Sequence, residues 1–239
     1  MGGRSLIALV GSGEYLPPME AVDRYLLEHL IDVAHVVCLP TAAGAEGAER
    51  IAYWSDLGEA HFSGLGVEVE SLPVIDKPSA NDAGLAERIR QANFIYLSGG
   101  KPDYLYRTLV LSLAWTAILE VMNKGGVVAG CSAGAMIMGE RIPGFPRSHK
   151  AFGLLRGAVI MPHFDEIPAA MVNALRIWAR GENTLLGIEG NTALVGSDQG
   201  YQVVGRGGVV VWNRQGKMRY TQGQSVSWPQ PMSDQRPAE

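Results

Sequence analysis

Short apolar runs alternate with longer amphipathic segments along most of the chain. In the longer segments apolar residues recur every three or four positions, which predicts helices with one buried face. The short runs are rich in Val, Ile and Leu and are bounded by Gly, Pro or polar residues, which predicts buried strands. We expect strands at Leu6–Val10, Val36–Leu39, Val67–Leu72, Phe94–Leu97, Val127–Ala129, Ala158–Met161 and Leu185–Ile188, and helices at Met19–Leu30, Glu46–Phe62, Ala83–Gln91, Leu113–Asn123, Ala133–Met138 and Ala169–Arg180.

The alternation of strands and helices predicts an α/β fold, a three-layer sandwich with a mostly parallel central sheet. The C-terminal part differs, because short strands are joined there by Gly-rich turns, which is typical of β-hairpins. These strands are expected at Ala193–Val195, Tyr201–Val204, Val209–Trp212 and Met218–Tyr220. We expect one domain over residues 1–221 and a polar, Pro-containing disordered tail over residues 222–239.

Composition narrows the class of protein further. The 239 residues carry a formal net charge of −4 with acidic and basic residues interspersed, which argues against nucleic-acid and anionic-membrane binding. The two cysteines, Cys38 and Cys131, are too few for a disulfide framework. No apolar run is long enough for a signal sequence or a membrane span, so we expect a cytoplasmic protein. No Cys/His cluster or H-E-x-x-H motif is present, so neither a metal nor another cofactor is expected.

The main chemical signal follows the predicted strand Val127–Ala129. The stretch Gly130-Cys-Ser-Ala-Gly134 has the form G-x-S-x-G and leads into a predicted helix. A strand that turns sharply into a helix through such a stretch exposes the serine hydroxyl as a nucleophile elbow. Ser132 is therefore the predicted nucleophile, and the N–H of Ala133 is a predicted oxyanion donor. The alternatives are a turn that only packs or binds an anion, and Cys131 as the nucleophile.

A serine nucleophile needs a base, because its free hydroxyl reacts poorly at neutral pH. Of the five histidines, His29, His35 and His61 fall at helix ends or a strand start and are expected to be structural. His163 follows a predicted strand and precedes a helix, at the edge where α/β sheets place catalytic groups. We therefore prefer His163 as the base, with His149 as the second choice.

A carboxylate that fixes the tautomer of the base is also expected. The candidates are Glu189, Asp165, Glu166 and Glu140. Glu189 ends a predicted strand and so shares the active edge, whereas Asp165 lies only two residues beyond His163. Glu189 is our preferred acid.

Two further glycine loops follow predicted strands. In Leu97-Ser-Gly-Gly-Lys-Pro-Asp103 the glycines allow the backbone to approach a substrate, and the N–H of Gly100 is the predicted second oxyanion donor. The alternative is a simple strand-to-helix turn. The loop Val10-Gly-Ser-Gly-Glu-Tyr15 lacks the Lys-Ser/Thr of a P-loop and the full G-x-G-x-x-G, so it is not a nucleotide-binding signal.

Together these motifs resemble the S51 peptidase family, which includes dipeptidase E (aspartyl dipeptidase) and cyanophycinase. The resemblance spans about Leu6 to Trp212. It is carried by Gly125-Gly-Val-Val-Ala-Gly-Cys-Ser-Ala-Gly-Ala135, Leu97-Ser-Gly-Gly100 with Tyr104-Leu105, Pro162-His-Phe164 and Leu186-Gly-Ile-Glu-Gly-Asn-Thr-Ala193. The resemblance implies a class I glutamine amidotransferase-like (flavodoxin-like) fold. It also implies that Ser132 is the nucleophile, His163 the base, and Gly100 and Ala133 the oxyanion hole.

The predicted activity is hydrolysis of a small peptide or isopeptide by a serine nucleophile, through an acyl-enzyme. An Asp-X dipeptide would need a cation, and Lys101, Arg147 and Lys150 are available. Cyanophycinase carries arginines just after its catalytic His, whereas Asp165-Glu-Ile-Pro-Ala-Ala170 is acidic and apolar. The expected partner is a small peptide, with a homodimer as the assembly to test. The alternatives are a non-catalytic binding module on the same fold and an amidotransferase-like amidase that uses Cys131.

Overall fold

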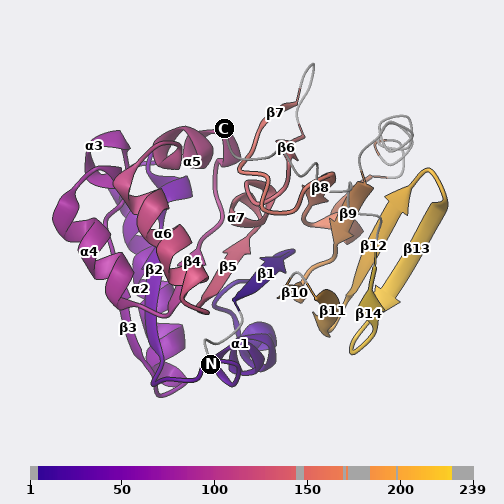
Figure 1. The fold of residues 1–239 in the computed structure, drawn as a ribbon, viewed down its shortest axis with the longest axis horizontal. Coiled ribbons are helices and arrows are strands. Elements are labelled where there is room, and N and C mark those ends of the chain that lie inside the picture. The colour runs from indigo at the N-terminus through magenta and orange to yellow at the C-terminus, as the bar shows by residue number, and fades with distance from the viewer. Residues whose placement is uncertain (1–4, 144–147, 169–170, 172–183, 198, 228–239) are drawn as a thin grey trace, which may run out of the picture.

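The structure is a computed structural model that describes residues 5–143, 148–168, 171, 184–197 and 199–227 (Figure 1). Its helices are α1 (Glu20–Leu27), α2 (Ala48–Gly64), α3 (Lys77–Ala80), α4 (Ala83–Gln91), α5 (Pro102–Leu109), α6 (Leu113–Asn123) and α7 (Ala133–Met136). Its strands are β1 (Leu6–Val10), β2 (His35–Leu39), β3 (Glu68–Ser71), β4 (Phe94–Leu97), β5 (Val127–Cys131), β6 (Arg141–Ile142), β7 (His149–Lys150), β8 (Ala158–Met161), β9 (Thr184–Ile188), β10 (Thr192–Ser197), β11 (Gly200–Gly205), β12 (Gly208–Asn213), β13 (Gly216–Thr221) and β14 (Ser225–Val226).

An eight-stranded sheet in the order β14-β11-β10-β1-β5-β4-β2-β3 forms the centre of the fold. Strands β3, β2, β4, β5 and β1 are parallel, and β10 continues the sheet antiparallel to β1. Helices lie on both sides of this sheet (Figure 1). The predicted α/β class and its three layers are therefore confirmed.

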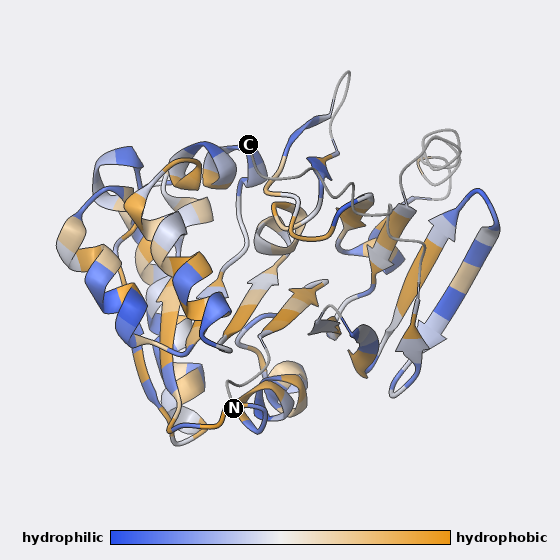
Figure 2. Ribbon diagram, viewed as in Figure 1, coloured by the Kyte–Doolittle hydropathy of each residue, from blue (hydrophilic) through white to orange (hydrophobic). Residues whose placement is uncertain are grey.

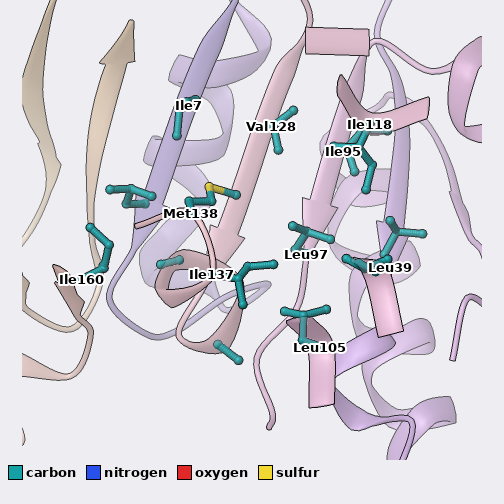
Figure 3. Packing of buried hydrophobic residues seen from close by; sticks show 14 of the residues in the cluster. Ile7, Leu39, Ile95, Leu97, Leu105, Ile118, Val128, Ile137, Met138 and Ile160 are labelled. Carbon is teal, nitrogen blue, oxygen red and sulfur yellow. The ribbon is translucent and has the colours of Figure 1, made fainter. Parts of the chain in front are cut away.

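Alternate residues of the central strands pack into separate cores on the two faces of the sheet. Ile7 and Leu9 of β1 face the core beneath α4, α6 and α7, whereas Ala8 and Val10 face the core formed with α1 and α2. The strands are mainly hydrophobic, whereas the edge strand β13 is mainly hydrophilic (Figure 2). Figure 3 shows Ile137 and Met138, at the end of α7, packed in the first core close to Leu97. Helix α7 is thus anchored in the core by the two residues that follow it.

A second, four-stranded sheet has the order β13-β12-β9-β8, and in it only β8 and β9 are parallel. Continued strand–helix alternation would place β8 and β9 in the central sheet. The structure instead places them in the second sheet. The reason is that β10 pairs with the edge of β1 and occupies the position that a further parallel strand would take. The chain crosses between the two sheets after β9, where Asn191 has a φ of 52° and its N–H donates to the Ser12 carbonyl.

The expected tail boundary at residue 221 was too early. Ser225–Val226 forms β14, which pairs with β11, and the Val226 side chain is buried. A single apolar residue between polar neighbours gives too weak a pattern to predict a two-residue strand. The predicted helix at residues 169–180 lies outside the described residues except for Met171, and residues 228–239 also lie outside them.

Helices α3 and α5 had no predicted bounds. Pro102 is the first residue of α5, where its missing N–H costs nothing. Among the described residues, no single helix has the length and apolarity to cross a membrane. Helices α5 and α6 pass that test only as a pair, with a 90° bend between them.

We predict that Gly134→Ala destabilises the fold, because a Cβ at position 134 would lie 2.5 Å from the carbonyl oxygen of Leu97 on β4. Forcing atoms into a packed core costs about 1–3 kcal/mol. Urea unfolding measures the change. Gly64→Ala, where the added Cβ meets nothing within 4 Å, is the matched control and should be neutral or stabilising. A Gly134→Ala protein as stable as the wild type would contradict this packing.

Candidate active site

Ser132 occupies the sharp turn between β5 and α7. Its φ of 49° and ψ of −106° place it in a region that few non-glycine residues adopt. A hydrogen bond to the central sheet fixes the turn, because the Ser132 N–H donates to the carbonyl of Val10 in β1 at 3.0 Å. The flanking glycines let the turn close, since a Cβ at position 130 would lie 2.5 Å from the carbonyl carbon of Gly134. The G-x-S-x-G spacing is thus explained by backbone packing.

His163 reaches Ser132 from the second sheet. It follows β8 and has left-handed backbone angles, with a φ of 51° and a ψ of 36°. Its Nε2 lies 3.2 Å from Ser132 Oγ, which is hydrogen-bonding distance. The structure therefore brings together the predicted nucleophile and the predicted base.

The segment after α7 aligns β8 so that His163 can reach the site. The Glu140 N–H donates to the Ala158 carbonyl at 2.8 Å, and the Glu140 carboxylate accepts from the Gly157 N–H at 2.6 Å. Glu140, one of the carboxylates considered as the acid, instead fastens the start of β8 to the end of α7.

Among the described residues, Glu166 is the carboxylate that lies within ion-pair distance of the His163 ring. Its Oε2 lies 3.3 Å from His163 Nδ1, the ring nitrogen that faces away from Ser132. Glu166 belongs to the 3₁₀ turn Phe164–Glu166, so the pair spans one short turn. The two side chains are 41% and 64% exposed, so solvent screens their attraction.

The structure does not bring Glu189, the preferred acid, into contact with the ring. Arg219 of β13 donates to both of its carboxylate oxygens, and the Gly208 N–H donates to Oε2 at 2.7 Å. The hydrogen bonds and charge of Arg219 lower the pKa of Glu189 below its ordinary value. The strand-end position of Glu189 was predicted correctly. Its partner was not, because Arg219 arrives from a hairpin 30 residues later.

Asp165 also serves the backbone, since its Oδ1 accepts from the Gly190 N–H at 2.8 Å. This bond ties the turn after His163 to the segment that follows β9. Glu189 is therefore a neighbour of the histidine turn in the fold, although its carboxylate points to β12 and β13.

Two backbone N–H groups beside Ser132 are left for a ligand. Within the described ranges, neither the Gly100 N–H nor the Ala133 N–H has an acceptor. Gly100 has a φ of 141°, and a Cβ there would lie 2.7 Å from the Ala42 carbonyl, so only glycine fits. A Cβ at position 99 would lie 3.4 Å from Ser132 Cβ, which places this loop directly against the nucleophile candidate.

Cys131 is unsuited to be the nucleophile. Its side chain is fully buried and its Sγ lies 2.8 Å from a carboxylate oxygen of Glu14. Burial, followed by the nearby Glu14 charge, raises the pKa of the thiol well above its ordinary value. Because the thiolate is the reactive form, this position holds an inert S–H.

The predicted substrate cations do not converge on Ser132. Among the described residues, no contact joins Lys101 or Lys150 to Ser132 or His163, and Arg147 lies outside these residues. Lys150 instead lines a small cavity of about 180 Å³ beside α5 with His149, whose ring lies 3.9 Å from the Asp103 carboxylate. Across all the described residues, no group of three His, Cys, Asp or Glu side chains could hold a metal ion.

The family model of peptidase family S51 matches residues 6–204, which include Ser132, His163 and both glycine loops. The chain belongs to peptidase family S51.

Known relatives of this S51 chain carry peptidase descriptions. A crystal structure of a peptidase from an acI-B1 actinobacterium superposes with a TM-score of 0.85 at 34% identity, over 95% of this chain and 98% of that one. A candidate peptidase E from Listeria monocytogenes EGD-e superposes with a TM-score of 0.63 at 20% identity, over 84% and 98% of the two chains, and shares the fold.

An uncharacterized peptidase of Listeria monocytogenes is 29% identical over 107 residues, or 45% of this chain. The match spans about half (49%) of that curated relative.

Two carboxylates that lie close to Ser132 or His163 were not singled out from the sequence. Glu166 was one of several candidates, and its position three residues after His163 in a tight turn was the available signal. Glu14 was noticed only within a glycine loop. Its place in the loop after β1, at the carboxyl edge of the sheet, was the signal available in the sequence, whereas its burial was not.

The Glu189–Arg219 pair predicts a pH dependence of stability. Because the folded-state pKa of Glu189 is lowered below its ordinary value of 4.5, its contribution is present above that value. The contribution is lost as the pH falls through the lowered pKa. The difference in unfolding free energy between wild type and Glu189→Gln, from urea titrations, should therefore shrink from about pH 7 to about pH 3. A difference that stays constant over this range would contradict the pairing.

Proposed function

We propose that this chain is a serine peptidase that hydrolyses a small peptide or isopeptide through an acyl-enzyme. The observation that carries the proposal is the 3.2 Å contact between Ser132 Oγ and His163 Nε2. A serine at a strained strand-to-helix turn, paired with a histidine, is the arrangement of a nucleophile elbow and its base. Membership of family S51 and likeness to proteins described as peptidases support the same reaction class.

The reaction follows from the geometry. Ser132 Oγ attacks the scissile carbonyl carbon while its proton passes to His163 Nε2. The N–H groups of Gly100 and Ala133 stabilise the negative oxygen of the tetrahedral intermediate. His163 gives the proton to the leaving amine as the C–N bond breaks. A water molecule, deprotonated by His163, then hydrolyses the acyl-enzyme.

Glu166 is the carboxylate that we assign to orient the imidazole. Its contact with Nδ1 favours the tautomer in which Nε2 accepts the serine proton, and it stabilises the imidazolium that forms. Glu189 is the second candidate, since it lies at the end of β9 beside the histidine turn. For Glu189 to act, its carboxylate would have to give up its hydrogen bonds from Arg219 and from the Gly208 N–H.

A small substrate agrees with the partial exposure of the site and with the short loops around it. Lys101, which directly follows Gly100 and is exposed, is the described cation best placed to meet an acidic group on such a substrate. A dipeptide and isopeptide screen at neutral pH is the direct way to identify the substrate.

We predict that a fluorophosphonate probe labels Ser132 stoichiometrically and that Ser132→Ala abolishes both labelling and hydrolysis, by at least about 10³-fold. Ser63→Ala, the same change at an exposed serine, should leave both unchanged. Peptide mapping locates the label. The folded protein should resist alkylation of Cys131 by iodoacetamide under the same conditions, because that thiol is buried. Folded wild-type protein that takes up no label would support the non-catalytic binding module instead, and rapid alkylation of Cys131 with loss of activity would support the amidase.

Paired variants decide which carboxylate orients His163. Glu166→Gln should lower kcat by about ten- to a hundredfold with little change in KM, because the neutral amide stabilises the imidazolium less. Glu189→Gln should have the smaller effect on kcat and the larger effect on stability. The reverse order of the kcat effects would transfer the orienting role to Glu189.

A further inference from the structure

The loop Gly11–Tyr15 after β1 places a carboxylate beneath the Ser132 turn. Glu14 is only 7% exposed, which is unusual for a glutamate, and it has a partner for each carboxylate oxygen. Oε1 accepts from the Gly99 N–H at 3.0 Å, and Oε2 accepts from the Cys131 thiol at 2.8 Å. One side chain therefore holds the residue before Gly100 and the residue before Ser132.

The next residue along the loop, Tyr15, contacts Ser98, the residue before Gly99. Tyr15 is buried, and its hydroxyl lies 3.0 Å from Ser98 Oγ. Two consecutive residues of one loop thus bind two consecutive residues of the other. Tyr15 also has a φ of 63°, a costly conformation for a tyrosine that persists only where its surroundings enforce it. Its ring packs 4.8 Å from that of Tyr96, centroid to centroid.

The opposite side of the segment is fixed as well. The Lys101 N–H donates to the Ala42 carbonyl at 3.0 Å, so Gly100 sits between this bond and the Glu14–Gly99 bond. The Gly99 N–H donates to Glu14, whereas the Gly100 N–H has no acceptor among the described residues. A donor aimed in advance at a developing charge lowers the barrier, whereas a mobile donor does so less well.

We propose that Glu14, assisted by Tyr15, is a positioning residue that fixes the Gly99–Gly100 segment against the Ser132 turn and so aims the Gly100 N–H into the oxyanion hole. This inference rests on the proposed serine-peptidase function. It assigns a role to the one glycine loop that carried no motif of its own. Glu14 acts through the backbone of Gly99 and has no contact with Ser132 Oγ or His163 among the described residues.

The test measures labelling of Ser132 by a fluorophosphonate, whose phosphonyl oxygen also needs the oxyanion donors. Loss of one such donor costs about 10²–10³-fold, so a displaced donor in Glu14→Ala should lower the maximal labelling rate by about 10–10²-fold. The half-saturating probe concentration should stay within about twofold, because the groups that bind the probe's leaving part are untouched. Tyr15→Phe, which removes only the hydroxyl bound to Ser98, should lower the maximal rate by less, about three- to tenfold.

Glu14→Gln is the rescue variant, because its amide oxygen still accepts from the Gly99 N–H, and its rate should stay within about fivefold of wild type. Glu28→Gln, the same change at an exposed glutamate, controls for the loss of charge and should match the wild type. Circular dichroism and urea unfolding verify that each variant is folded. Should Glu14→Ala fail to fold, Glu14→Asp, whose carboxylate is one methylene too short, takes its place.

Folded Glu14→Ala with a maximal rate within twofold of wild type would overturn the inference. So would Glu14→Gln as impaired as Glu14→Ala, since the bond to the Gly99 N–H would then not be what matters. Wild-type protein that takes up no label contradicts the proposed function itself, before any Glu14 variant is compared.

Discussion

The site depends on one backbone turn, the step from β5 into α7 at Ser132. A non-glycine residue with a φ of 49° is strained, and the strain is balanced by the packing of α7 on β4 and by the bond from the Ser132 N–H to Val10. The same geometry lifts the hydroxyl out of the sheet and leaves the Ala133 N–H without an acceptor among the described residues. Relaxing the turn would therefore displace the proposed nucleophile and one proposed oxyanion donor together.

The base comes from a different sheet, so its position relative to Ser132 is a tertiary property. Glu140 and Asp165 hold the two ends of the β8 segment to the rest of the fold, the first at Gly157 and the second at Gly190. Both carboxylates accept hydrogen bonds from backbone N–H groups. Among the described residues, Glu166 is the carboxylate that contacts the His163 ring.

The sequence predicted the longer strands, most helices, and Ser132 and His163 as partners, because each leaves a local pattern in the chain. The two-residue strands β6, β7 and β14 are too short to leave one. It could not predict the partner of Glu189, because the competition between Arg219 and His163 for that carboxylate depends on how a distant hairpin packs. Nor could it separate β8 and β9 from the central sheet, since apolar runs do not reveal which strand they pair with. The contacts of Glu14 could not be predicted for a related reason, because the burial and the partners of a carboxylate are visible only once the fold surrounds it.

The central claim is that Ser132, His163 and two backbone N–H groups form one reaction centre. A crystal structure of the fluorophosphonate adduct tests it most directly. We predict a bond from phosphorus to Ser132 Oγ and a phosphonyl oxygen about 3 Å from the nitrogens of both Gly100 and Ala133. An adduct on another residue, or a phosphonyl oxygen turned away from both nitrogens, would contradict the account.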